Sequence, residues 1–272
     1  MTSRERAPGQ ATGRRRPELG SPERVVEVVF GCRPEDVSAD VILSPFIPLR
    51  AFRRHLGEDV VDLSPPFFFR GITGRFAGRR VSVIATGVGP SRVGDCIGFL
   101  SFTPARRVFF AGAVGGLAAD HEIGAFFVPT EVADGEGYTP YATRRFEEVV
   151  AAAPRLTFPE GTRGALERFL EAEGVGPISG RVFTVGAITA ESRENLETLA
   201  RLGYEAVEME LSAFCSASAL YGFEPTALTY VSDLPLGSSL WAEKTPEEQE
   251  SLRSAYRALP LLALRYLAAG RP

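Results

Sequence analysis

Two carboxylates flank a methionine in the segment VEMELSAF (207–214), and the residues that follow are mostly small and apolar. A helix of that composition is buried. Acidic residues suit a helix N-terminus electrostatically, which would give Glu208 and Glu210 a purely structural role. However, a buried carboxylate is costly unless hydrogen bonds satisfy it. A ligand with adjacent hydroxyl groups, such as a ribose, would supply two donors to one carboxylate.

A third candidate acid, Asp233, follows a short β-branched run at residues 227–231. One interpretation is structural, because an aspartate just beyond a strand often caps the next helix. The other is catalytic, because apolar surroundings raise the pKa of a carboxyl group and suit it to general-acid work. Both interpretations stand at this point.

Glycines gather at two further places that follow strand-like runs, GVGPSR (87–92) and AGAVGGLA (111–118). Glycine lets a backbone approach a ligand, and a helix N-terminus offers free N–H groups and a positive potential to an anion. Tight connections and close strand crossings explain such glycines equally well. Neither segment has the spacing of a dinucleotide-binding or Walker A loop.

The composition argues against several other chemistries. The chain has 272 residues, two histidines, three cysteines without a C-x-x-C pair, and a formal net charge of −4. Zinc or iron–sulfur sites, a disulfide framework and Ser-His-Asp catalysis are therefore disfavoured, and we expect no metal. Unpaired cysteines fit a reducing cytoplasm. The charge argues against nucleic-acid binding, and no stretch of eighteen apolar residues suggests a membrane span. The single lysine, Lys244, looks like compositional bias.

Strand-like and helical patterns alternate along the chain, which predicts an α/β fold with a largely parallel sheet. The expected strands are residues 25–30, 41–43, 81–86, 108–111, 125–129, 180–185 and 227–231. The expected helices are residues 49–56, 92–101, 159–173, 193–202, 208–221 and 246–269. We expect residues 1–22 to be a disordered tail, since no apolar run follows Arg14, Arg15 and Arg16, and residues 23–272 to form one domain. Ligands bind beyond the strand carboxyl ends in such sheets.

Three segments in this order, AGAVGGLA (111–118), VEMELSA (207–213) and VSD (231–233), resemble the nucleoside phosphorylase and nucleosidase superfamily. TAESRE (189–194) is similar to the base-side loop of several members. The resemblance implies a three-layer α/β sandwich around a mixed, partly barrel-like sheet. It also implies a homo-oligomer (dimer, trimer or hexamer), a small-molecule nucleoside substrate, and no cofactor.

The resemblance assigns roles to individual residues. Glu210 matches the glutamate that binds the ribose hydroxyls, Met209 packs under the sugar, and Glu208 lines the same region. Asp233 matches the aspartate that protonates N7 of a purine, so Asp233 and Glu210 are the expected catalytic pair. The remaining expectations are a nucleophile or phosphate region at Arg50, Gly87, Gly112 and Ala113, and a base site at Val114, Gly115, Thr189 and Glu191.

Departures from the family pattern bear on the nucleophile. Phe46 and Ile47 stand where phosphorylases carry the Gly-Asp of a phosphate loop, Phe110 stands for an arginine, and Ala113 for a serine or threonine. These changes favour hydrolysis of a purine nucleoside, or of a 5′-modified one. The glutamate that activates water in nucleosidases has no evident match. Phosphorolysis therefore remains an alternative, as does a specialised-metabolism or non-catalytic nucleoside-binding homologue.

Overall fold

The computed structural model describes residues 15–65 and 68–270, and its centre is a mixed sheet. Within those residues the sheet has ten strands. They are β1 (Asp40–Ser44), β2 (Val61–Leu63), β3 (Arg70–Phe76), β4 (Arg79–Ala85), β5 (Arg107–Gly116), β6 (Phe126–Gly135), β7 (Arg155–Thr157), β8 (Ile178–Val185), β9 (Ala206–Glu208) and β10 (Glu224–Asp233).

Part of this sheet closes on itself. The strands β4, β1, β5 and β10 lie side by side and run parallel. From β10 the pairing continues through β6, β8 and β9, and β9 returns to β5, so that five strands form a ring. The antiparallel strands β2 and β3 extend the sheet beyond β4. This arrangement confirms the expected mixed, partly barrel-like sheet.

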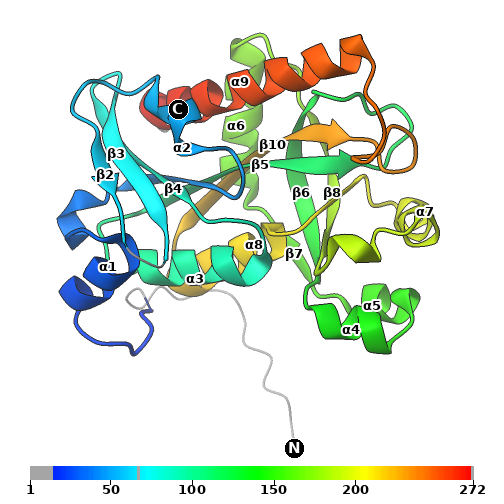
Figure 1. The fold of residues 1–272 in the computed structure, drawn as a ribbon, viewed down its shortest axis with the longest axis horizontal. Coiled ribbons are helices and arrows are strands. Elements are labelled where there is room, and N and C mark those ends of the chain that lie inside the picture. Colours follow the sequence, from blue (N-terminus) through cyan, green and yellow to red (C-terminus); the bar gives the residue numbers. More distant parts are fainter. Residues whose placement is uncertain (1–14, 66–67, 271–272) are drawn as a thin grey trace, which may run out of the picture.

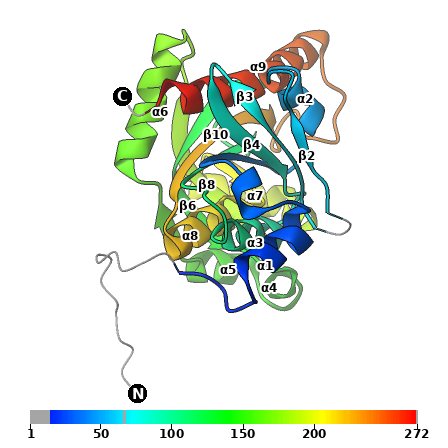
Figure 2. The same cartoon turned by 90° about the vertical axis from the view of Figure 1, so that its left-hand side faces the viewer.

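Helices cover both faces of the sheet (Figures 1 and 2). The described helices are α1 (Pro22–Phe30), α2 (Leu49–Arg53), α3 (Pro90–Leu100), α4 (Tyr138–Thr143), α5 (Phe146–Ala152), α6 (Glu160–Ala172), α7 (Arg193–Arg201), α8 (Leu211–Tyr221) and α9 (Pro246–Ala269). One apolar core joins α1, α3 and α8 to the sheet, and a second joins α2, α6 and α9 to the opposite face. These two cores make the sandwich three layers deep.

The prediction of a strand at residues 25–30 is wrong, because these residues form most of helix α1. The hydroxyl of Ser21 accepts a hydrogen bond from the N–H of Arg24, Pro22 begins the helix, and Gly31 ends it with a φ of 65°. Valine favours strands, but serine followed by proline at the start and glycine at the end is typical of a helix. The local capping residues therefore outweighed the β-branched composition.

The expected tail falls largely outside the described residues, which begin at residue 15. From there the chain approaches the main body, where the guanidinium of Arg16 donates to the carbonyl of Ser101 at 3.0 Å. Within the described ranges no helix is both long and apolar enough to cross a membrane.

Candidate active site

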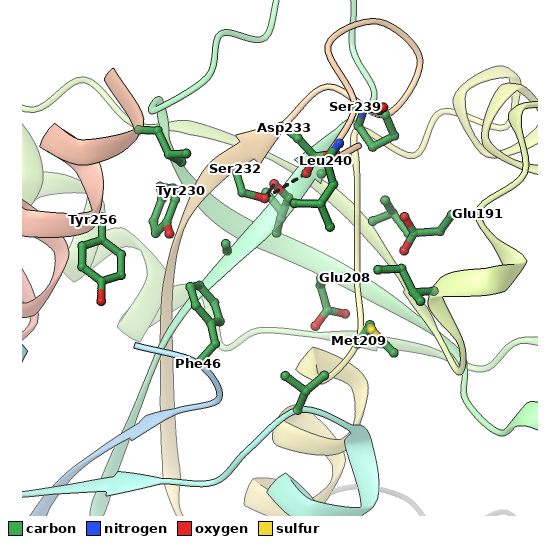
Figure 3. A pocket seen from close by; sticks show the side chains of 18 of the residues that line it. Phe46, Glu191, Glu208, Met209, Tyr230, Ser232, Asp233, Ser239, Leu240 and Tyr256 are labelled. Carbon is green, nitrogen blue, oxygen red and sulfur yellow. Dashed lines mark hydrogen bonds between the residues drawn. The ribbon is translucent and has the colours of Figure 1, made fainter. Parts of the chain in front are cut away.

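A cavity of about 930 Å³ opens where β5, β9 and β10 end. Eight of the predicted site residues line it, namely Glu208, Met209, Glu210, Asp233, Ala113, Val114, Gly115 and Glu191. Figure 3 shows how they are distributed: Glu191 lies at one end, Glu208 and Met209 lie near the middle, and Asp233 lies above Glu208. Segments more than one hundred residues apart in sequence thus converge, as expected for a sheet whose strand ends carry the ligand site.

Four other predicted residues do not line the cavity, which are Arg50, Gly87, Gly112 and Thr189. Arg50 is exposed on α2, and Arg54 reaches the cavity instead. A side chain at Gly112 would collide with the ring of Phe110, so this glycine accommodates a buried phenylalanine. Gly87 has a φ of 74°, and a side chain there would meet the guanidinium of Arg92 at 2.9 Å. These two glycines therefore serve local packing.

The sequence pattern predicted a helix that begins at Glu208. In the structure Glu208 instead ends strand β9, and α8 begins at Leu211. Its Oε2 accepts from the N–H groups of Glu210 and Leu211, at 2.5 and 2.6 Å, at the start of α8. Its Oε1 accepts from the hydroxyl of Thr184. Burial and the neighbouring Glu210 raise the pKa of this carboxyl. Glu208 thus shapes the turn that presents Glu210, in addition to lining the cavity.

Glu210 lies at the N-terminus of α8 and is only 6% exposed. Its Oε1 accepts from the backbone N–H of Gly89 at 2.7 Å. Burial raises its pKa, and the hydrogen bond from Gly89 opposes that effect. Among the described residues, the carboxylate of Glu210 accepts a hydrogen bond from Gly89 alone, through Oε1. Its Oε2 is therefore available to a ligand that donates hydrogen bonds.

Asp233 is the last residue of β10, and two hydrogen bonds fix its carboxyl group (Figure 3). The hydroxyl of Ser232 donates to Oδ1 and the N–H of Leu240 donates to Oδ2, each at 2.9 Å. Burial raises the pKa of Asp233, while these bonds and the positive charge of Lys244 act in the opposite direction. Asp233 does not cap a helix, since the chain after it forms a loop that returns to its carboxylate.

Lys244 fastens that loop. Its ammonium group donates to the carbonyls of Ser238 and Ser239 at 2.7 and 2.5 Å, just before Leu240. It also donates to the hydroxyl of Ser238 at 3.2 Å. The single lysine of the chain therefore stabilises the segment that holds Asp233, a role that composition did not suggest.

Glu191 lines the same cavity as Asp233, near enough for their charges to interact. Burial, and secondarily the negative charge of Asp233, raise the pKa of Glu191 to about 7. Two carboxyl groups that disfavour each other's ionisation in a cavity are typical of functional sites, where protons are shared or delivered.

Aromatic and basic side chains at the opposite end of the cavity were not assigned to the site from the sequence. Phe46 and Tyr230 pack edge to face with their ring centres 6.4 Å apart, and Tyr256 lies beside them (Figure 3). Arg253 and Arg257 on α9 also line the cavity. Residues 252, 253, 256 and 257 lie on one face of α9 and all line the cavity. Their helical spacing in the sequence could have indicated that they face the same site.

His121, one of the two histidines, is buried against the sheet. Its ring packs edge to face on Phe127 with a centroid separation of 5.9 Å, and it does not line the cavity.

The fold belongs to a class of α/β proteins that is known from solved structures. A uridine phosphorylase from Vibrio fischeri ES114 superposes with a TM-score of 0.72 at 19% identity, covering 92% of this chain and 97% of that chain. A 5′-methylthioadenosine/S-adenosylhomocysteine nucleosidase from Neisseria meningitidis superposes with a TM-score of 0.63 at 18% identity, covering 85% and 97% of the two chains.

Sequence comparison then identifies the family. The model of the phosphorylase superfamily matches residues 49–268, and the chain belongs to that superfamily. A DeoD-type purine nucleoside phosphorylase from Myxococcus xanthus (strain DK1622) is 31% identical over 219 residues, covering 78% of this chain and 87% of that protein. The resemblance found in the three motifs is thereby confirmed over most of the chain.

Proposed function

We propose that the protein cleaves the N-glycosidic bond of a purine nucleoside, or of a 5′-modified purine nucleoside, by hydrolysis. The observation that carries this proposal is the position of Asp233, fixed by Ser232 and Leu240 in the cavity that Glu210 also lines. A proton donor for the base and a carboxylate for the sugar are thus present in one cavity of adequate size for a nucleoside.

The reaction develops opposite charges on its two halves. As the bond from C1′ to N9 breaks, its electron pair goes to the purine, which takes a proton on N7 from Asp233. The sugar becomes cationic, and the carboxylate of Glu210 at its hydroxyls stabilises that charge. Water adds at C1′ and releases a proton to the solvent, from which Asp233 regains the proton that it gave to N7, so the products are the free base and the free sugar. The raised pKa of Asp233 favours the protonated form that this step requires.

The nucleophile region supports water over phosphate. Phe46, Ala113 and Tyr230 line this part of the cavity, where phosphorylases place polar anchors, and Arg50 lies outside it. A phosphate ion needs donors for several charged oxygens, whereas a water molecule needs two to four partners. The hydroxyl of Tyr230 is available for such a contact, because burial and Tyr256 raise the pKa of this phenol and keep it protonated.

Phosphorolysis is the second candidate, because two observations favour it. The curated relatives are named purine nucleoside phosphorylases, and Arg54, Arg253 and Arg257 line the cavity. These arginines could hold a phosphate ion in place of the missing anchors.

Incubation of the protein with a panel of purine and pyrimidine nucleosides, with and without inorganic phosphate, tests the proposal. Chromatography should detect free purine together with free ribose in phosphate-free buffer. Strict dependence on phosphate, with ribose 1-phosphate as product, would establish the second candidate. Binding of nucleosides without turnover would contradict both and indicate a non-catalytic homologue.

A further inference from the structure

Basic side chains gather at the α9 side of the cavity. Glu191 stands at one end, and Glu208 and Asp233 lie between Glu191 and Phe46 (Figure 3). Arg193 and Lys244 also line the cavity, but Arg193 is paired with Glu197, and Lys244 donates to the loop after Asp233. Beyond Phe46 and Tyr230 lies Tyr256 on α9 (Figure 3), and the same helix contributes Arg253 and Arg257 to the lining, with Arg54 beside Arg257. A bound molecule therefore meets three carboxyl groups, then aromatic rings, and then three guanidinium groups.

Two of these arginines are adjacent and lack an acidic partner. The guanidinium of Arg54 donates to the carbonyl of Arg257 at 3.2 Å, which joins the end of α2 to α9. Arg253 forms an ion pair with Glu250 at 2.9 Å, and Arg53 is paired with Asp62. Among the described residues, neither Arg54 nor Arg257 forms an ion pair with an acidic side chain. Their positive charge is therefore available to a ligand in the cavity.

The proposed binding of a nucleoside determines which of its groups would meet these arginines. If Asp233 contacts the base and Glu210 contacts the 2′ and 3′ hydroxyls, the substituent at C5′ is the part of the molecule left to extend past Phe46 and Tyr230. Arginine recognises carboxylate and phosphate groups through paired hydrogen bonds, and neutral groups of similar shape do not match that geometry.

Resting on the proposed function, we infer that the substrate carries an anionic group, a carboxylate or a phosphate, on its C5′ substituent, and that Arg54 and Arg257 bind this group. The aromatic side chains of Phe46, Tyr230 and Tyr256 contact the part of the substituent between the ribose and the charge. The arginines thus contribute to substrate specificity, whereas the carboxyl groups at the other end carry the chemistry.

The test compares a purine nucleoside bearing a 5′-carboxymethylthio group with its neutral carboxamide. Wild-type protein should prefer the carboxylate in kcat/KM by about tenfold or more, the effect of one charge-assisted hydrogen bond. Arg54→Gln and Arg257→Gln should each lower the ratio of kcat/KM for the carboxylate to kcat/KM for the carboxamide, bringing it closer to 1. The matched control is Arg144→Gln, which removes an exposed arginine at the end of α4 and should leave the preference unchanged. A ratio of two substrates on one protein is independent of the amount that folds.

Binding separates this inference from the proposed function. Non-cleavable C-nucleosides with the same two substituents give dissociation constants even if no turnover occurs. Preferential binding of the carboxylate without turnover of any nucleoside would support the inference and contradict the function. Turnover with equal binding of the two compounds would overturn the inference and leave the function intact.

Inorganic phosphate is the competing occupant of the arginines. If cleavage of an unmodified nucleoside requires phosphate and Arg257→Gln raises the KM for phosphate by about tenfold or more, the arginines bind the co-substrate, and the inference is overturned. A nucleoside 5′-phosphate distinguishes the two anions, since preference for it over the carboxylate would identify the substituent as a phosphate ester.

Discussion

The backbone N–H of Gly89 donates a hydrogen bond to Oε1 of Glu210, 2.7 Å away and separated by 121 positions in the sequence. The loop before α3 orients the carboxylate that would bind the sugar, and the expected contact of this loop with the nucleophile stays a prediction. Gly89 reaches this position with a φ of 114°, a conformation that side-chain-bearing residues rarely adopt.

Substitution of Gly89 by alanine should therefore lower kcat/KM by about tenfold, the value of one hydrogen bond to a charged group. A methyl group at Gly89 meets no atom within 4 Å, so the effect comes from backbone strain of about 1–2 kcal/mol. Gly78→Ala in the β3–β4 turn is the control, because Gly78 also has a positive φ (80°) and open space. It should cost similar stability in urea unfolding and leave kinetics unchanged. Equal kinetic losses in both variants would refute the role of Gly89.

Replacement of Asp233 by asparagine should reduce purine cleavage by about 10²–10⁴-fold, because the amide cannot donate the carboxyl proton to the base. Asparagine can still accept the hydrogen bond from the N–H of Leu240 through its oxygen, and its amide N–H can donate to the hydroxyl of Ser232, whose own proton can turn to the carbonyl of Val114, so the loop should stay in place. Affinity for a non-cleavable nucleoside should change little. Asp59→Asn at an exposed position serves as the control, and normal turnover by Asp233→Asn would exclude the general-acid role.

Glu191 should make the protein less stable as the pH rises from about 4.5 to about 7. In that interval the folded state keeps a proton on Glu191 that the unfolded chain has released, so the free energy of unfolding falls with pH and then levels off. The difference is on the order of 1–3 kcal/mol, allowing for partial exposure. Urea unfolding between pH 5 and pH 8 should show a shallower slope for Glu191→Gln. The exposed Glu194→Gln should behave as wild type, and identical slopes in all three proteins would contradict this assignment.

Lys244→Met should both lower activity and alter its pH dependence. Loss of the donors to Ser238 and Ser239 loosens the loop that holds Asp233, with an expected decrease in kcat of about tenfold. Loss of the positive charge raises the pKa of Asp233, so the alkaline decline in activity should move to higher pH. Lys244→Arg keeps the positive charge, so its activity should decline at the same alkaline pH as that of the wild type. A pH profile of kcat/KM measures both effects. Lower activity with an alkaline decline at the same pH as in the wild type would assign Lys244 a purely structural role.

The sequence indicated most of the site because its residues lie in short continuous motifs. The segments that contain Glu208 to Glu210, Val114 with Gly115, and Asp233 each follow a buried strand, and parallel strands end at the same edge of a sheet. Glu191 was identified through a neighbouring loop of the same kind. The periodicity also predicted most helices and strands, but not the strands β2, β3, β7 and β9 or the helices α1, α4 and α5.

Arg50 illustrates what a linear pattern could not resolve. It was chosen by analogy with a family motif, yet it does not line the cavity, whereas Arg54 at the end of α2 contacts α9 and lines the cavity. Which of two arginines on a short helix faces a cavity depends on the rotation of that helix against its neighbour.

By itself, the sequence determined the α/β class, the superfamily and the carboxyl groups of the site, because local composition and short motifs encode them. The tertiary structure decided the role of Glu208 in capping α8, the hydrogen bonds of Lys244 to the loop after Asp233, and the gathering of Arg54, Arg253 and Arg257 at one side of the cavity. These depend on contacts between segments distant in sequence, and such contacts arise only when the sheet closes and α9 packs across it.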